Sequence, residues 1–329
     1  MKTNSKNSFR WIMGLTILML PFLMVPAVAS AQGGSMGGKN WGLNVGATVL
    51  RDDNLIGLPS RAPVPGALAN KEADDTGIQW NANLFYKHNY SNKLQLKFDY
   101  DVRQTLYKNN SNLDLTTQIF GAGSTFKLNP LVNITLDYKY IYNNVSGQDF
   151  SGIHYISPAF NYMNKTFGLT RLAYTYMYIN NWTTDLRDIN SSGFSLDQYY
   201  FFSNFKRRIN IGYKWVNEDA ETNNIFDKNK HVGKAGFKTP LVWGINFSAD
   251  ASFAVSDYNS RLIEAGGARK RSDWEQRYSG SIDKELISKW GYLQNLVVHA
   301  KYEYYRSISM SSVRNFDNNH FEVGFDASF

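Results

Sequence analysis

Apolar and polar residues alternate along most of the chain after Asn40. The clearest run extends from Leu94 to Leu106, where every even position except Gln104 is apolar or aromatic and every odd position is polar. Because successive side chains of a β-strand point to opposite faces, this run predicts a strand with one apolar and one polar face. The run is longer than the roughly five or six residues common in soluble sheets, and it is typical of a transmembrane strand, which needs about 9–11.

The same period of two recurs and predicts a series of such strands. Seven more strands have a clear apolar face, made of Trp41, Leu43, Val45, Ala47 and Val49; Trp80, Ala82, Leu84 and Tyr86; Ile134, Leu136, Tyr138, Tyr140 and Tyr142; Leu172, Tyr174, Tyr176 and Tyr178; Ile209, Ile211, Tyr213 and Trp215; Ile245, Phe247, Ala249, Ala251, Phe253 and Val255; and Leu296, Val298, Ala300, Tyr302 and Tyr304. Weaker alternation predicts return strands near 115–128, 153–163, 194–205, 230–239 and 274–286, and a last strand over 320–329.

Short and long connections alternate between these strands. Short turns are predicted near 91–93, 129–130, 164–167, 206–208, 240–243 and 287–291, and long polar loops near 51–77, 108–114, 143–152, 180–193, 219–229, 256–273 and 307–318. Short periplasmic turns and longer outer loops are typical of outer-membrane barrels. The predicted fold class is therefore all-β: a transmembrane antiparallel up-and-down β-barrel of about 14 strands with both termini periplasmic.

The last strand carries a further signal. One of its faces consists of Phe321, Val323, Phe325, Ala327 and the terminal Phe329. A final strand that ends in an aromatic residue resembles the signal recognised by the barrel assembly machinery of the outer membrane. We therefore expect Phe329 to be a membrane-assembly signal and that machinery to be a partner.

The N-terminal segment has the pattern of a secretory signal peptide. Lys2, Lys6 and Arg10 precede an apolar run over 11–28, and an Ala-Ser-Ala cleavage site ends at Ala31. The alternative is an uncleaved membrane anchor, against which the two prolines of the run argue. The predicted organisation is a signal peptide over 1–31, a flexible lead-in over 32–39 and a single outer-membrane barrel over 40–329.

Composition excludes several other classes of protein. The mean hydropathy of −0.40 is too polar for a bundle of membrane helices, but it suits a barrel in which every second residue faces lipid. The absence of cysteine excludes disulfides and lipoprotein acylation. The leader holds three of the 35 basic residues, so the net charge of +7 falls to +4 after cleavage, which does not indicate nucleic acid as a partner.

No motif in the chain indicates catalysis. The histidines are His88, His154, His231, His299 and His320, and none has the spacing of a zinc site or of a barrel hydrolase. The pairs Asp52-Asp53 and Asp74-Asp75 are expected to be solvated loop residues. We therefore predict no catalytic residue, no metal, no cofactor and no enzyme activity.

The polar faces of the predicted strands carry charges of both signs. The pore-lining candidates are Lys97, Asp99, Asp101, Arg103, Asp137, Lys139, Arg171, Lys214, Asp250, Lys301, Glu303 and Glu322, with Asp326 at the same face of the last strand. Such charges can create a transverse field for a polar solute, or can pair across strands and fill the interior. Eight-stranded barrels are filled, whereas barrels of sixteen to eighteen strands leave a water channel, so the strand number leaves both interpretations open.

Two other features bear on the ends of the barrel. Tyrosines near the predicted strand ends indicate aromatic girdles in the headgroup layers, namely Tyr86, Tyr90, Tyr107, Tyr142, Tyr178, Tyr302 and Tyr304. The loops over 51–77 and 256–273 are expected to be exposed. The alternatives are that they fold inward as a constriction or contact anionic surface polysaccharide.

The two ends of the chain are similar to a known group of barrels. Arg51-Asp52-Asp53-Asn54 after the first strand, and Tyr304, Ser312 and Asn315-Phe316-Asp317 before Phe329, resemble the porin 2 barrels, exopolysaccharide-export barrels and surface lipoprotein assembly modifiers. The resemblance implies export through the outer membrane, although the periplasmic helical repeats of the modifiers have no counterpart here. The strand number is also similar to the fatty-acid channels, which begin with a larger N-terminal hatch.

The expected function is a pore or export channel for a polar solute or a secreted polysaccharide. A non-conducting structural or adhesive barrel is the second hypothesis, and an outer-membrane hydrolase is the third. The expected location is the Gram-negative outer membrane, where lipid and lipopolysaccharide would surround the protein.

Overall fold

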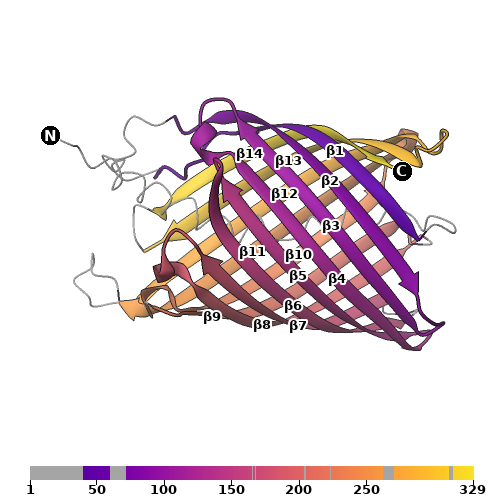
Figure 1. Ribbon diagram of the computed structural model, residues 1–329, viewed down its shortest axis with the longest axis horizontal. Coiled ribbons are helices and arrows are strands. Elements are labelled where there is room, and N and C mark those ends of the chain that lie inside the picture. The colour runs from indigo at the N-terminus through magenta and orange to yellow at the C-terminus, as the bar shows by residue number, and fades with distance from the viewer. Residues whose placement is uncertain are drawn as a thin grey trace.

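The protein forms a closed barrel. The computed structural model describes residues 40–59, 72–164, 166, 168–203, 205–222, 224–261, 270–310 and 314–329, in which fourteen antiparallel strands pair each with the next (Figure 1). The strands are β1 (Trp41–Asp52), β2 (Asp75–Asn89), β3 (Leu94–Tyr107), β4 (Leu115–Asn129), β5 (Val132–Val145), β6 (Gln148–Asn164), β7 (Gly168–Asn181), β8 (Ile189–Phe202), β9 (Arg207–Ala220), β10 (Lys228–Pro240), β11 (Ile245–Arg261), β12 (Lys270–Ile287), β13 (Asn295–Ser309) and β14 (Phe316–Ser328). The predicted fold class and strand number are confirmed.

The first and last strands close the ring. Gly46 of β1 lies opposite Asp326 of β14, and Asp52 lies opposite His320. The terminal Phe329 extends this ladder, because its N–H donates to the carbonyl of Leu43 at 2.8 Å and its carbonyl accepts from the N–H of Leu43 at 3.3 Å. The aromatic residue at the chain end thus completes the seam, while its part in membrane assembly stays a prediction.

The two ends of the barrel differ in their connections. We call the end that holds the six turns 90–93, 130–131, 165–167, 203–206, 241–244 and 288–294, together with the C-terminus, the turn end; the opposite end is the loop end (Figure 1). The prediction of a long loop near 143–152 is wrong. Ser146 and Gly147 form a two-residue hairpin turn with φ of 51° and 79°, and positive φ at both central residues suits the twist of the flanking strands.

Short 3₁₀ helices shape three connections at the loop end. η2 (Ser111–Leu113), η3 (Asp185–Arg187) and η4 (Asn224–Phe226) are each followed directly by an aspartate. Asp114, Asp188 and Asp227 accept hydrogen bonds of 2.7–2.9 Å from the backbone N–H seven residues earlier, at the end of the preceding strand. The same arrangement therefore ends three strands. In each, an aspartate carboxylate accepts from the last backbone N–H of the strand, which would otherwise lack a partner on a neighbouring strand.

Asp75 is not the solvated loop residue that was expected. It begins β2 and is only 3% exposed. Its carboxylate accepts hydrogen bonds from the backbone N–H groups of Thr76, Asn109 and Asn110 at 2.7–3.1 Å, and from the Asn110 side chain at 3.0 Å. One buried carboxylate thereby holds the connection between β3 and β4 against β2.

Asp75→Ala is expected to lower the free energy of unfolding by about 2–3 kcal/mol, because hydrogen bonds to an ionised group are worth about 1.5–3 and several donors would lose their acceptor. Urea unfolding in lipid vesicles would measure the loss. Asp74→Ala is the matched control: its side chain is 63% exposed and meets Arg51 at 3.8 Å, so removal should cost under about 1 kcal/mol. Equal losses for both variants would contradict the role given to Asp75.

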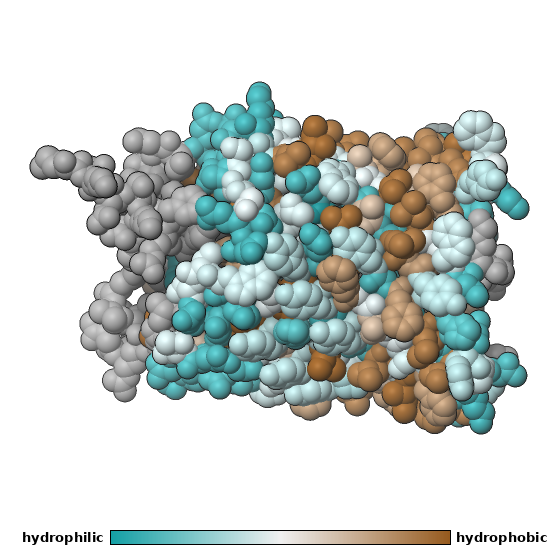
Figure 2. All heavy atoms as spheres, in the orientation of Figure 1, coloured by the Kyte–Doolittle hydropathy of each residue, from teal (hydrophilic) through white to brown (hydrophobic). Residues whose placement is uncertain are grey.

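The outward faces form an apolar belt. Exposed side chains such as Leu84, Phe98, Leu136 and Phe325 alternate with inward polar ones. Apolar side chains gather toward the turn end, and hydrophilic side chains cover the loop-end part of the wall (Figure 2). No helix within the described ranges is long and apolar enough to cross a membrane.

Most of the tyrosines expected in the girdles lie on the outward face, with one exception. Tyr302 is 49% exposed on the outside of β13. Tyr107, in contrast, follows the outward-facing Leu106 in β3, and strand alternation therefore turns it toward the lumen.

Candidate functional site

The candidate site is the lumen. The pore-lining candidates occupy the inward positions of their strands, since each alternates with outward apolar neighbours. They are Lys97, Asp99, Asp101 and Arg103 on β3, Asp137 and Lys139 on β5, Arg171 on β7, Lys214 on β9, Asp250 on β11, Lys301 and Glu303 on β13, and Glu322 on β14. Their part in conduction stays a prediction.

Several of these candidates belong to one chain of charges across the seam. Lys301 lies 3.4 Å from Glu303 and 3.5 Å from Glu322. Glu303 continues to Arg277 of β12 at 3.3 Å, and Glu322 continues to His320 at 3.2 Å. His320 reaches Asp52 of β1 at 2.9 Å. Asp52 is therefore a buried strand residue, not the solvated loop residue that was expected.

A stripe of lysines on β10 was missed by sequence reasoning. Lys228, Lys230, Lys234 and Lys238 share the inward face and form ion pairs with carboxylates of β8, β9 and β12. The pairs are Lys228–Glu218 at 3.0 Å, Lys230–Glu275 at 3.0 Å, Lys234–Asp197 at 2.7 Å and Lys238–Asp283 at 3.7 Å. All four lysines occupy even positions, so the period of two did contain this signal.

Solvent access to the lumen changes along the axis. Toward the turn end, the side chains of Lys97 and Lys238 are 46% and 40% exposed. Toward the loop end, Lys230 and Arg271 are each 8% exposed. The inward side chains are therefore more open to solvent near the turns and more closely packed near the loops.

Aromatic rings contribute to the packing near the loop end. The buried ring of Tyr258 has the Arg271 guanidinium 3.9 Å and the Lys228 ammonium 5.6 Å from its centroid. The buried ring of Tyr305 has Arg277 at 5.4 Å. These cation–π contacts hold the rings and charges together in the narrow part of the lumen.

Part of the lumen wall, from β5 to β7, carries apolar inward side chains. Ile141 of β5, Ile153 and Ala159 of β6, and Ala173 of β7 are buried on the inward side. Among the described residues, β6 has no charged residue at an inward position. Charged inward side chains therefore occur on β3, β5 and β7 as well as on β8 to β14, and the least charged part of the lumen wall lies at β6.

Three glycines leave room for carboxylates on the inward face of the barrel wall. A Cβ atom at Gly212 would collide with the carboxylate of Asp197, and one at Gly236 would collide with that of Asp250. Gly121 leaves the same space for Asp99. Without these Cβ atoms, the carboxylates lie flat against the wall and do not project across the channel.

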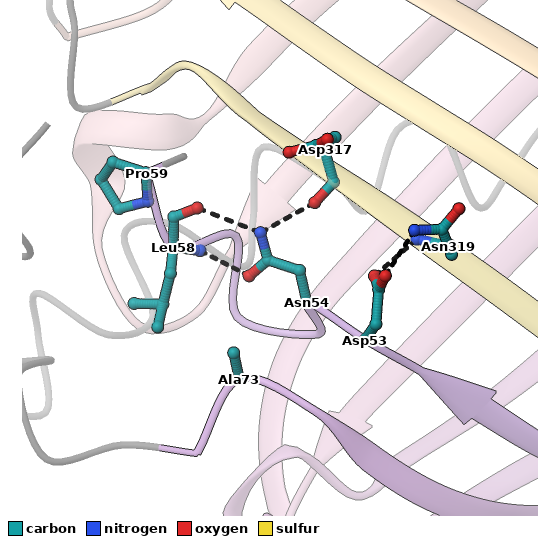
Figure 3. A pocket seen from close by; sticks show the side chains of 7 residues that line it. All are labelled: Asp53, Asn54, Leu58, Pro59, Ala73, Asp317 and Asn319. Carbon is teal, nitrogen blue, oxygen red and sulfur yellow. Dashed lines mark hydrogen bonds between the residues drawn. The ribbon is translucent and has the colours of Figure 1, made fainter. Parts of the chain in front are cut away.

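A shallow pocket of about 350 Å³ lies at the rim of the loop end (Figure 3). Asp53 points toward Asn319, whose N–H donates to it at 2.6 Å. The Asn54 amide donates to the carbonyls of Leu58 and Asp317 at 3.0 and 2.8 Å. Residues from both ends of the chain thus meet here, and their hydrogen bonds fasten the first loop to β14.

The described residues contain no group of three or more histidine, aspartate or glutamate side chains arranged to hold a metal ion. The predicted absence of catalysis stays a prediction.

Comparisons with known proteins define the class of fold. No protein-family model matches the chain, and no curated protein matches it either. An anion-selective porin from Comamonas acidovorans is 8% identical, with a TM-score of 0.51 over 88% of this chain and 98% of the porin. A loop-deletion mutant of OmpT, an outer membrane protein of Vibrio cholerae, is 10% identical, with a TM-score of 0.50 over 88% of this chain and all of the other. The fold is that of an outer-membrane β-barrel.

Proposed function

We propose that this protein is an outer-membrane channel for a small polar or charged solute. The observation that carries the proposal is the solvent access of charged inward side chains near the turn end, where Lys97 and Lys238 are open to water. A barrel that served only as a scaffold would gain nothing from solvated charges in its interior. The similarity in fold to an anion-selective porin supports the same function.

The direction of the barrel in the membrane is part of the proposal. The turn end would face the periplasm and the loop end the outside, as in other barrels with short turns and long loops. The signal peptide over 1–31 lies outside the described residues, and its cleavage after Ala31 is tested by the N-terminal sequence of the mature protein. Lipopolysaccharide and the barrel assembly machinery are the partners that this location implies.

Planar-bilayer recording tests conduction. Discrete open-channel steps from the purified full-length protein would support a channel. A protein that inserts but stays silent would favour the second hypothesis, a structural or adhesive barrel. Polysaccharide export, suggested by the resemblance of the chain ends, would be supported if a polysaccharide added on the turn side interrupts the current.

Lys97→Glu combined with Arg103→Glu is expected to shift ion selectivity toward cations. Both side chains occupy the inward face of β3, and the double change makes the wall more negative by four charges. The reversal potential in a KCl gradient measures the shift. Lys284→Glu is the matched control, because its outward position on β12 lies outside the ion path; an equal shift in the control would show that the inward charges do not set selectivity.

A further inference from the structure

The six connections at the turn end share an unusual charge. Their described residues include no aspartate or glutamate, and three of the turns contain a described lysine, namely Lys93, Lys206 and Lys289. At the adjoining strand ends, Lys127 and Arg207 are exposed cations and Glu285 is an exposed carboxylate, so the cations remain in excess. The loop end is different, since its connections contain acidic residues such as Asp53, Asp114 and Asp227. The barrel is therefore basic at one rim and rich in carboxylates at the other.

The same turns expose aromatic rings at their tips. Trp243 is 81% exposed, Tyr292 is 86% exposed, and Tyr90, Phe205 and Trp290 are also among the most exposed side chains. Large rings in contact with water lose the free energy that apolar burial would provide. The exposed rings at these turns are therefore most stable in an environment that is apolar on one side and polar on the other.

The apolar belt extends as far as these turns. Leu128, Phe202 and Leu286 are exposed on the wall beside them, and apolar side chains gather toward this end in Figure 2. A bilayer that covers the belt would therefore place its headgroup layer at the turns. Tryptophan and tyrosine favour this layer, and lysine and arginine there are attracted to anionic headgroups.

We propose that the turn-end rim, defined by the described residues Lys93, Lys127, Lys206, Arg207 and Lys289, binds the phosphates of anionic phospholipids in the leaflet it contacts. The ammonium and guanidinium groups would meet the phosphates while the rings of Trp243, Trp290 and Tyr292 enter the boundary of the acyl chains. The inference depends on insertion into a membrane but not on conduction, so a silent barrel would leave it intact.

The test uses the full-length protein in vesicles of phosphatidylcholine with phosphatidylglycerol as a minor component. In a background with Trp80, Trp182, Trp215 and Trp274 replaced by phenylalanine, brominated phosphatidylglycerol or brominated phosphatidylcholine is included in turn, and quenching of the remaining tryptophan fluorescence reports which lipid lies next to the rim. The rim variant combines Lys206→Gln, Arg207→Gln and Lys289→Gln. The control variant combines Arg51→Gln, Lys108→Gln and Lys270→Gln at the loop end.

The wild type and the control variant are expected to prefer phosphatidylglycerol. In the rim variant, the preference for phosphatidylglycerol over phosphatidylcholine should fall about fivefold for each cation removed, because one cation near an anionic surface contributes about 1 kcal/mol. High salt should weaken the preference in the wild type. Equal quenching by both lipids in the wild type, or an unchanged preference in the rim variant, would overturn the proposal and leave a protein partner as the occupant to be sought.

Discussion

Glu275→Gln is expected to lower the free energy of unfolding of the barrel by about 3–5 kcal/mol, the cost of removing one partner from a buried ion pair. The Lys230 ammonium lies 3.0 and 3.2 Å from the two carboxylate oxygens of Glu275, and its side chain is almost fully buried. The variant keeps the shape of the side chain but leaves the buried ammonium facing a neutral amide. Urea unfolding in vesicles measures the loss.

Asp283→Asn is the matched control for this prediction. Asp283 lies on the same face of β12 and pairs with Lys238 at 3.7 Å, but both side chains are partly open to water. Solvent screening should therefore limit the cost to about 1 kcal/mol or less. The double variant Lys230→Met with Glu275→Met should regain much of the lost stability, because a packed apolar pair can replace a buried ion pair. If Asp283→Asn lowers the free energy of unfolding as much as Glu275→Gln does, burial does not determine how much these ion pairs contribute to stability.

Tyr258→Ala combined with Tyr305→Ala is expected to raise single-channel conductance severalfold. Both rings are buried in the closely packed part of the lumen, and the narrowest section of a pore contributes most of its resistance. Removing two large rings from that section should widen it more than any change near the turns. Planar-bilayer recording at fixed salt concentration measures the change.

The matched control for the conductance prediction is Tyr302→Ala. Tyr302 belongs to the same strand as Tyr305 but faces outward, so its removal leaves the lumen as it was. Conductance should equal that of the wild type. An unchanged conductance in the Tyr258 and Tyr305 variant would place the constriction elsewhere in the barrel.

The barrel itself was predictable because its cause is local. A strand exposed to lipid on one side and to a lumen on the other must alternate, and the run from Leu94 to Leu106 shows this without reference to any other strand. The inward faces of β3, β5 and β13 were predicted from the same pattern. The lysines of β10 follow it too, but Gly233 and Ala235 make the outward side of that strand weakly apolar, so the pattern was harder to recognise.

Other features could not be predicted from local pattern. The turn at Ser146 and Gly147 lies between polar residues that resemble a longer loop, and only the pairing of β5 with β6 shows that the strands continue to it. Asp75 appeared solvated because its donors, Asn109 and Asn110, lie in the next loop-end connection. A carboxylate can be recognised as a buried hydrogen-bond acceptor only when the tertiary structure shows where its donors lie.

By itself, the sequence determined the number of strands and the side of the wall that strand residues face, since the period of two is a local property of each strand. It did not determine the length of every connection, because a two-residue turn at Ser146 and Gly147 stands where a long loop was expected. Only the tertiary structure decided which charges meet. Asp52 and His320 are neighbours across the seam although 268 residues separate them, and Lys230 reaches Glu275 across β11. Such pairs, and the height at which the lumen narrows, depend on the register between strands, which no single strand encodes.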